Sequence, residues 1–138
     1  MTHSDPITRA TQKNLSARVS QRSHAERVLR LAPLLPSDER LLLEQVYRHG
    51  LSIADLARLT GLPPRTLQRR IRNIVKRLNS DLFRFVAAQE DILPRTVRPT
   101  ARRVAIHGRS LRAAARESGL TLHRVREHMR IVQALARL

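Results

Sequence analysis

The chain lacks several residue types. It has no cysteine and no tryptophan, and only one tyrosine and two phenylalanines among 138 residues. Without cysteine it forms neither disulfides nor thiolate metal sites. Proteins that grip single-stranded nucleic acid commonly stack bases on exposed aromatic rings, of which this chain has almost none to spare. No apolar run approaches the roughly 20 residues of a membrane-spanning helix, and no secretory signal pattern opens the chain.

Acidic residues are also scarce. The chain has 27 Lys plus Arg against 11 Asp plus Glu, a formal net charge of +16. Such self-repulsion destabilises a compact protein unless a polyanion is normally present. A membrane surface is the weaker candidate, because no basic stretch displays a strongly apolar outer face. We therefore expect a cytoplasmic, nucleoid-associated protein that binds double-stranded DNA and no membrane.

The residues of common catalytic sites are missing as well. The six histidines show no paired-ligand spacing for zinc. There is no glycine-rich phosphate loop, and no carboxylate cluster that could hold the two metals of a nuclease. The sequence therefore predicts no enzyme, no metal and no cofactor.

Residues 49–78 have the pattern of a helix-turn-helix. Gly50 can end a preceding helix with a positive φ. Ser52 and Asp55 form a capping box that opens a short helix, and Gly61 ends that helix. Pro64 suits the first turn of the next helix, where its missing N–H costs nothing.

The helix predicted over residues 64–78 has two different faces. Its apolar residues recur at three- and four-residue steps, as in an amphipathic helix: Leu67, Ile71, Ile74 and Leu78. The opposite face carries Arg65, Thr66, Gln68, Arg69 and Arg72, with Arg70, Lys76 and Arg77 on its flanks. No acidic residue occurs between Asp55 and Asp81. A solvated surface helix usually mixes charges of both signs, so this face is expected to meet a polyanion.

The same pattern returns 58 residues later (107 minus 49). His49, Gly50, Ser52, Ala57, Arg58, Gly61, Leu62 and Arg72 recur as His107, Gly108, Ser110, Ala115, Arg116, Gly119, Leu120 and Arg130. These identities include the glycines and caps that set the geometry. Thr121 is expected to cap a second reading helix, whose outer face offers His123, Arg124, Arg126, Glu127 and Arg130. We expect this copy to bury its small core against the segment from Phe83 to Val86.

The remaining stretches complete an all-α prediction of two tandem three-helix units joined by a helix and a short proline-containing linker. We predict a basic flexible arm over 1–22, a first helix-turn-helix domain over 23–93, and a second unit over 94–138. Within the first domain, Ser23 should open one helix and Ser37 should cap another over about 38–48. The linker between Pro94 and Pro99 should be extended before each proline.

Residues 34–78 resemble region four of bacterial sigma factors, and residues 99–136 resemble it more weakly. The shared pattern is a Leu-Pro before an acidic, Arg-containing helix start, then Gly-Leu-Ser, Ile-Ala-Asp-Leu-Ala, Gly-Leu and an Arg-rich helix. The resemblance implies that the outer face of residues 65–72 reads a promoter element in the major groove. Nothing in the chain resembles the region that melts promoter DNA, and tandem units are not the sigma arrangement.

Other interpretations remain open. Residues 56–70 also resemble the first helix-turn-helix of arabinose-regulator-type activators, which carry two such units. A protein-binding adaptor that contacts RNA polymerase or an anti-sigma-like partner is one alternative to a transcriptional regulator, and a DNA-binding accessory module of a transposase or recombinase is another. RNA polymerase and a second copy of the chain are therefore further candidate partners.

Overall fold

The computed structural model describes residues 6–138, with side chains described from residue 11 onward. These residues form helices and no strand, which confirms the all-α class. The elements are α1 (Pro6–Leu31), η1 (Ala32–Leu34), α2 (Ser37–Tyr47), α3 (Ile53–Thr60), α4 (Pro64–Leu78), α5 (Asp81–Gln89), η2 (Glu90–Ile92), α6 (Arg98–Ala101), the π-helical η3 (Arg102–Ile106), α7 (Leu111–Ser118) and α8 (Leu122–Ala136). No helix in this part of the chain is long and apolar enough to cross a membrane.

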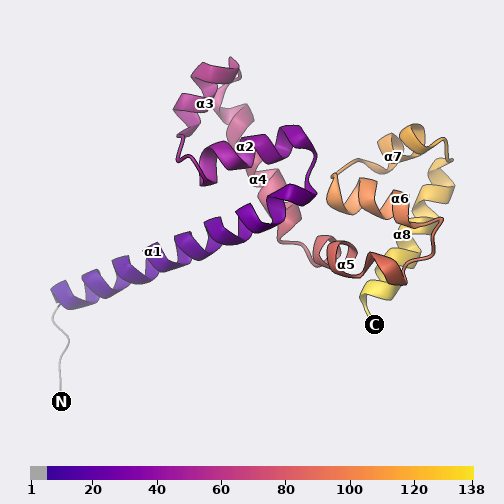
Figure 1. Cartoon of the computed structure of the whole chain (residues 1–138), viewed down its shortest axis with the longest axis horizontal. Coiled ribbons are helices and arrows are strands. Elements are labelled where there is room, and N and C mark those ends of the chain that lie inside the picture. The colour runs from indigo at the N-terminus through magenta and orange to yellow at the C-terminus, as the bar shows by residue number, and fades with distance from the viewer. Residues whose placement is uncertain (1–5) are drawn as a thin grey trace.

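Two groups of helices lie side by side, with α1 projecting away from both (Figure 1). In the first group α2 and α3 pack with α4, and in the second α6 and α7 pack with α8. Between them, α5 contacts α4 on one side and η3 and α8 on the other. Phe83 and Val86 of α5 are both almost fully buried. The second copy packs on this segment through Met129 and Val132 of α8, which share its cluster, whereas Ala114, Ala115 and Val125 do not belong to that cluster.

One hydrophobic core runs through both groups. It extends from Val28 of α1 through Leu43, Ile74 and Phe83 to Val132 of α8. A second, much smaller cluster holds Ala114, Ala115 and Val125 between α7 and α8. Because α7 contributes mainly alanines, the second group depends on the shared core for most of its apolar burial.

A flexible arm is predicted for residues 1–22; the structure gives residues 6–22 helical backbone, and residues 1–5 lie outside the described part. Residues 6–22 belong to α1, which continues without a break to Leu31. Ser23 therefore lies inside a helix and does not open one. No glycine or proline occurs between Pro6 and Pro33, so nothing in the sequence interrupts the helix once Val28 anchors its C-terminal end.

Two smaller predictions also need correction. Ser37 is the first residue of α2 and makes no capping hydrogen bond, because Pro36 occupies the N-cap position. The linker is extended at Leu93, before Pro94, but Arg98 already begins α6 although Pro99 follows it. The Arg98 Nε donates to the Leu93 carbonyl oxygen at 3.0 Å, and this contact holds the linker in a tight turn.

Candidate nucleic-acid interface

Local interactions fix how α4 leaves the first unit. The Asp55 amide donates to Ser52 Oγ and the Ser52 amide donates to the Asp55 carboxylate, each at 3.1 Å, so the predicted capping box is confirmed. Hydrogen bonds from Ser52, with further help from Arg58, lower the pKa of Asp55. Gly61 then adopts φ +74° and Pro64 begins α4. The turn between α3 and α4 is therefore short, and the chain changes direction sharply there.

The two faces of α4 are divided as the sequence predicts. Leu67, Ile71, Ile74 and Leu78 are buried. Thr66 is half-buried, and the other predicted reading side chains are exposed: Arg65, Gln68, Arg69, Arg72 and Lys76. The four basic side chains among them form no ion pair with an acidic side chain of residues 11–138. Their charge is therefore available to an anionic partner.

Two flanking arginines of α4 have partners within the protein. Arg70 Nη2 lies 2.8 Å from the Asp38 carboxylate of α2. Arg77 pairs with Glu39, also of α2, and both side chains are largely buried. Arg70 is exposed on the flank of the outer face, as expected, whereas Arg77 is largely buried, and the guanidinium groups of both tie α4 to α2.

The outer face of α8 differs in charge from that of α4. The Arg124 amide donates to Thr121 Oγ1 at 3.1 Å, so the predicted cap is confirmed. His123 Nε2 lies 3.0 Å from the Glu127 carboxylate on the same helix. The remaining predicted side chains, Arg124, Arg126 and Arg130, are exposed and unpaired with any acidic side chain of residues 11–138.

The second unit repeats the first in its backbone. The bounds of α7 and α8 are those of α3 and α4 moved by 58 residues. The four glycines have φ between 67° and 74° and pair at the same offset, Gly50 with Gly108 and Gly61 with Gly119. Glycine adopts these positive φ values at little cost, so the two turns share one geometry.

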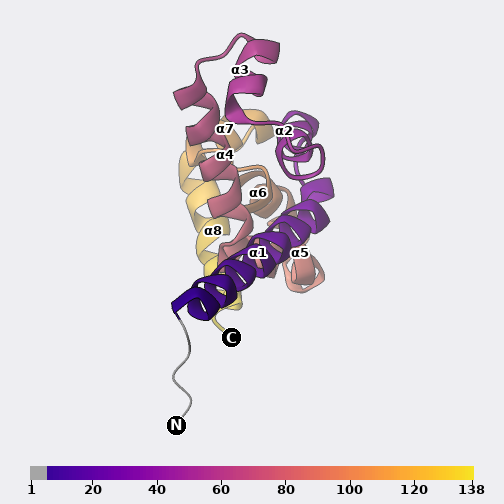
Figure 2. The same ribbon diagram turned by 90° about the vertical axis from the view of Figure 1, so that its left-hand side faces the viewer.

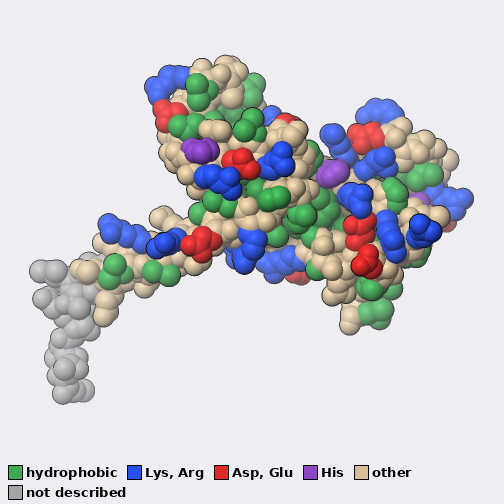
Figure 3. Space-filling model, viewed as in Figure 1, with side chains coloured by type: hydrophobic (Ala, Val, Ile, Leu, Met, Phe, Trp, Pro, Cys, Tyr) green, Lys and Arg blue, Asp and Glu red, His purple; other side chains and the backbone are tan. Residues whose placement is uncertain are grey.

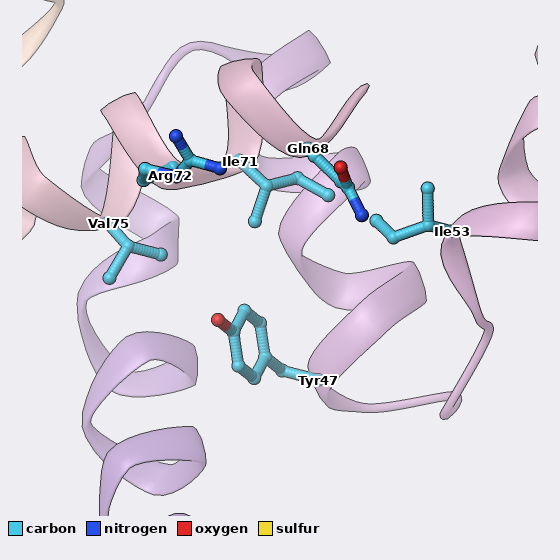
Figure 4. A pocket seen from close by; sticks show the side chains of 6 residues that line it. All are labelled: Tyr47, Ile53, Gln68, Ile71, Arg72 and Val75. Atoms are coloured by element: carbon cyan, nitrogen blue, oxygen red, sulfur yellow. The ribbon is translucent and has the colours of Figure 1, made fainter. Parts of the chain in front are cut away.

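A groove beside each of the two helices also repeats. In the first unit, Tyr47 and Ile71 face each other across it and the guanidinium of Arg72 is turned away from Tyr47 (Figure 4). The first groove is lined by Tyr47, Ile53, Gln68, Ile71, Arg72 and Val75, and the second includes Leu111, Arg126, Met129, Arg130 and Gln133. These five residues lie 58 positions after the last five of the first groove.

The two helices lie on one side of the molecule. In Figure 2, α4 and α8 lie along the left, whereas α2 and α5 lie on the right. Figure 3 shows the other side, on which α2 and α5 lie, and Lys and Arg side chains there occur over α1 and over both groups of helices, with fewer acidic ones. No group of three or more His, Asp or Glu in the described part could hold a metal ion.

Comparison with known families agrees with the geometry of the first unit. Residues 25–78 match the family model described as sigma-70, region 4. This match covers the C-terminal part of α1 and continues to the end of α4. Neither the curated proteins nor the solved structures include a significant match to the chain. Residues 25–78 are therefore similar to sigma-70 region 4, which agrees with a DNA-binding, transcription-related helix-turn-helix in this part of the chain.

Proposed function

We propose that the protein is a transcriptional regulator that binds double-stranded DNA sequence-specifically, with both α4 and α8 as reading helices. The observation that carries the proposal is the outer face of α4. This face has four exposed basic side chains without an acidic partner in residues 11–138, interleaved with Gln68. Arginine makes bidentate contacts with guanine edges and glutamine with adenine edges in the major groove.

The repeat supports the same role for α8. Its helix bounds, its positive-φ turn and its groove recur at the same offset, and its outer face carries Arg124, Arg126 and Arg130. Because α4 and α8 lie on one side of the molecule (Figure 2), one duplex could meet both. We propose residues 94–138 as a second helix-turn-helix unit on this basis.

A selection for bound sequences from a random pool of duplex DNA tests the proposal. We expect one enriched site, bound on the order of 10³-fold or more tightly than a scrambled duplex. Binding should also weaken by roughly 10³ to 10⁵ between 50 and 200 mM salt, as for about 6 to 10 phosphate contacts. Failure to enrich any sequence, or an affinity unaffected by salt, would exclude this function.

A protein partner is the second candidate function, and an exposed apolar patch favours it. Leu41 of α2 is 56% exposed and Leu59 of α3 is 73% exposed. Leu41 and Leu62 line a groove on the first unit, together with the buried Leu42, Leu56 and Leu67. If RNA polymerase binds this groove, Leu41→Ser with Leu62→Ser should reduce polymerase retention and leave the affinity for the selected duplex unchanged.

A further inference from the structure

Arg77 contacts groups of both units. It lies in the last turn of α4, and its side chain is only 17% exposed. Its guanidinium pairs with the Glu39 carboxylate of the first unit, and its Nε donates to the carbonyl oxygen of Ile106 at 3.0 Å. Ile106 is the last residue of η3, directly before the second helix-turn-helix pattern. One side chain of the first reading helix therefore holds the backbone that leads to the second.

Gly108 lets the guanidinium of Arg77 approach this backbone. A Cβ built on Gly108 would lie 2.1 Å from Nη1 and 2.7 Å from Cζ of Arg77. Gly50, at the equivalent position of the first unit, has no atom within 4 Å of such a Cβ. Gly50 is thus required only for its positive φ, whereas Gly108 also leaves the space that Arg77 fills.

The shared hydrophobic core also holds the two units together. Phe83 and Val86 of α5 are buried in a cluster that contains Leu78 of α4 and Val132 of α8. A rotation of one unit against the other would separate these side chains and break the contacts of Arg77. The two reading helices are consequently held at one spacing and one angle.

We propose that this clamp of Arg77, Glu39, Ile106 and Gly108 sets the spacer length of a composite DNA site, so that the protein reads two half-sites only at one separation. The inference rests on the proposed function of α4 and α8. Arg77 is a positioning residue, since its guanidinium contacts protein groups. B-DNA has about 10 to 10.5 base pairs per turn, so each inserted pair rotates one half-site by about 35° relative to the other.

The experiment measures the affinity of the full chain for the selected duplex and for derivatives with one, two or five base pairs inserted between the half-sites. For the unaltered protein we expect a loss on the order of ten-fold or more at each insertion, because one half-site is no longer contacted. For Arg77→Lys we expect losses of about three-fold or less. Lysine keeps a cation for Glu39 but lacks the fork that also reaches Ile106.

Two further variants complete the test. Arg70→Lys makes the same substitution on the same helix in an exposed pair within the first unit, and should keep the spacer dependence of the unaltered protein. Gly108→Ala places a Cβ against Arg77 and should flatten the dependence as Arg77→Lys does. Thermal unfolding checks that each variant is folded. If Arg77→Lys does not fold, the spacer dependence of Gly108→Ala tests the role of the clamp.

The outcomes separate this inference from the proposed function. Tight, sequence-specific binding that tolerates every insertion overturns the fixed spacing and leaves duplex recognition standing. A spacer dependence that is the same in folded Arg77→Lys and Gly108→Ala as in the unaltered protein overturns the role of the clamp. Absence of duplex binding by the unaltered protein overturns the proposed function itself.

Discussion

His123 Nε2 lies 3.0 Å from the Glu127 carboxylate on the outer face of α8. The equivalent positions of α4, 58 residues earlier, carry Arg65 and Arg69, which have no acidic partner in residues 11–138. The two helices therefore present different chemistry to DNA. Glu127 can accept a hydrogen bond from cytosine N4 but repels phosphate, so α8 should bind more weakly than α4 and prefer other bases.

Arg69→Ala should relax specificity at one base pair. A bidentate arginine–guanine contact is worth about 1–3 kcal/mol of discrimination against the wrong base. Arg124→Ala, by contrast, should weaken binding evenly across sequences, as the removal of a phosphate contact does. The measurement is the affinity of each variant for the selected duplex and for a set of singly changed duplexes. Equal weakening of all duplexes by Arg69→Ala would mean that this side chain contacts only the DNA backbone.

Basic residues on the exposed part of α1 should add phosphate contacts. Residues 11–23 are exposed, and Lys13 and Arg18 lie in this stretch. Replacing both with Gln should reduce the slope of log affinity against log salt by about 0.9 for each phosphate that is no longer neutralised. Circular dichroism confirms that the helix is retained. An unchanged slope would show that α1 lies away from the DNA.

Gly61→Ala and Gly119→Ala should each lower the free energy of unfolding by about 1–2 kcal/mol. Both glycines have positive φ, and neither has an atom within 4 Å of an added Cβ. The cost is therefore backbone strain alone. Gly61→Asn is the control and should lose less stability, because asparagine tolerates the left-handed conformation better. Denaturant unfolding gives these values. Alanine variants as stable as the unaltered protein would contradict the turn geometry.

Stability should depend on pH in the range where His107 titrates. Burial lowers the pKa of His107 below its usual value, and the charges of Arg102, Arg109 and Arg77 lower it further. Between the unfolded-state pKa of about 6.5 and the lowered pKa of the folded state, the unfolded chain binds more protons. The free energy of unfolding should therefore decrease as the pH falls below about 6.5.

His107→Gln isolates this contribution. The variant cannot take up a proton at this position, so its stability should depend less on pH between about 6.5 and 5. Denaturant unfolding of both proteins across this range provides the comparison. His49→Gln, which changes the matching histidine of the first unit, is the control. A pH dependence that is identical in His107→Gln and the unaltered protein would assign the effect to other groups.

Much of the fold follows from local features of the sequence. The capping box of Ser52 and Asp55, the positive φ of Gly61 and the apolar spacing of α4 involve residues within a few positions of one another. The sequence therefore predicts the two turns and the helices on either side of them. The prediction that Ser23 opens a helix is wrong because it relies on a local capping pattern. That pattern lies inside a longer helix, whose end is anchored by the burial of Val28.

The sequence by itself determined the all-α class, the charge and the repeat of the helix-turn-helix pattern, because each depends on composition or on short-range spacing. Only the tertiary structure decided which arginines of α4 are available to DNA. Arg70 and Arg77 resemble their neighbours in sequence, but their carboxylate partners lie 32 and 38 residues away. Only the folded chain joins the two units, because the burial of Phe83 and the contact of Arg77 with Ile106 require α5 and η3 to pack together.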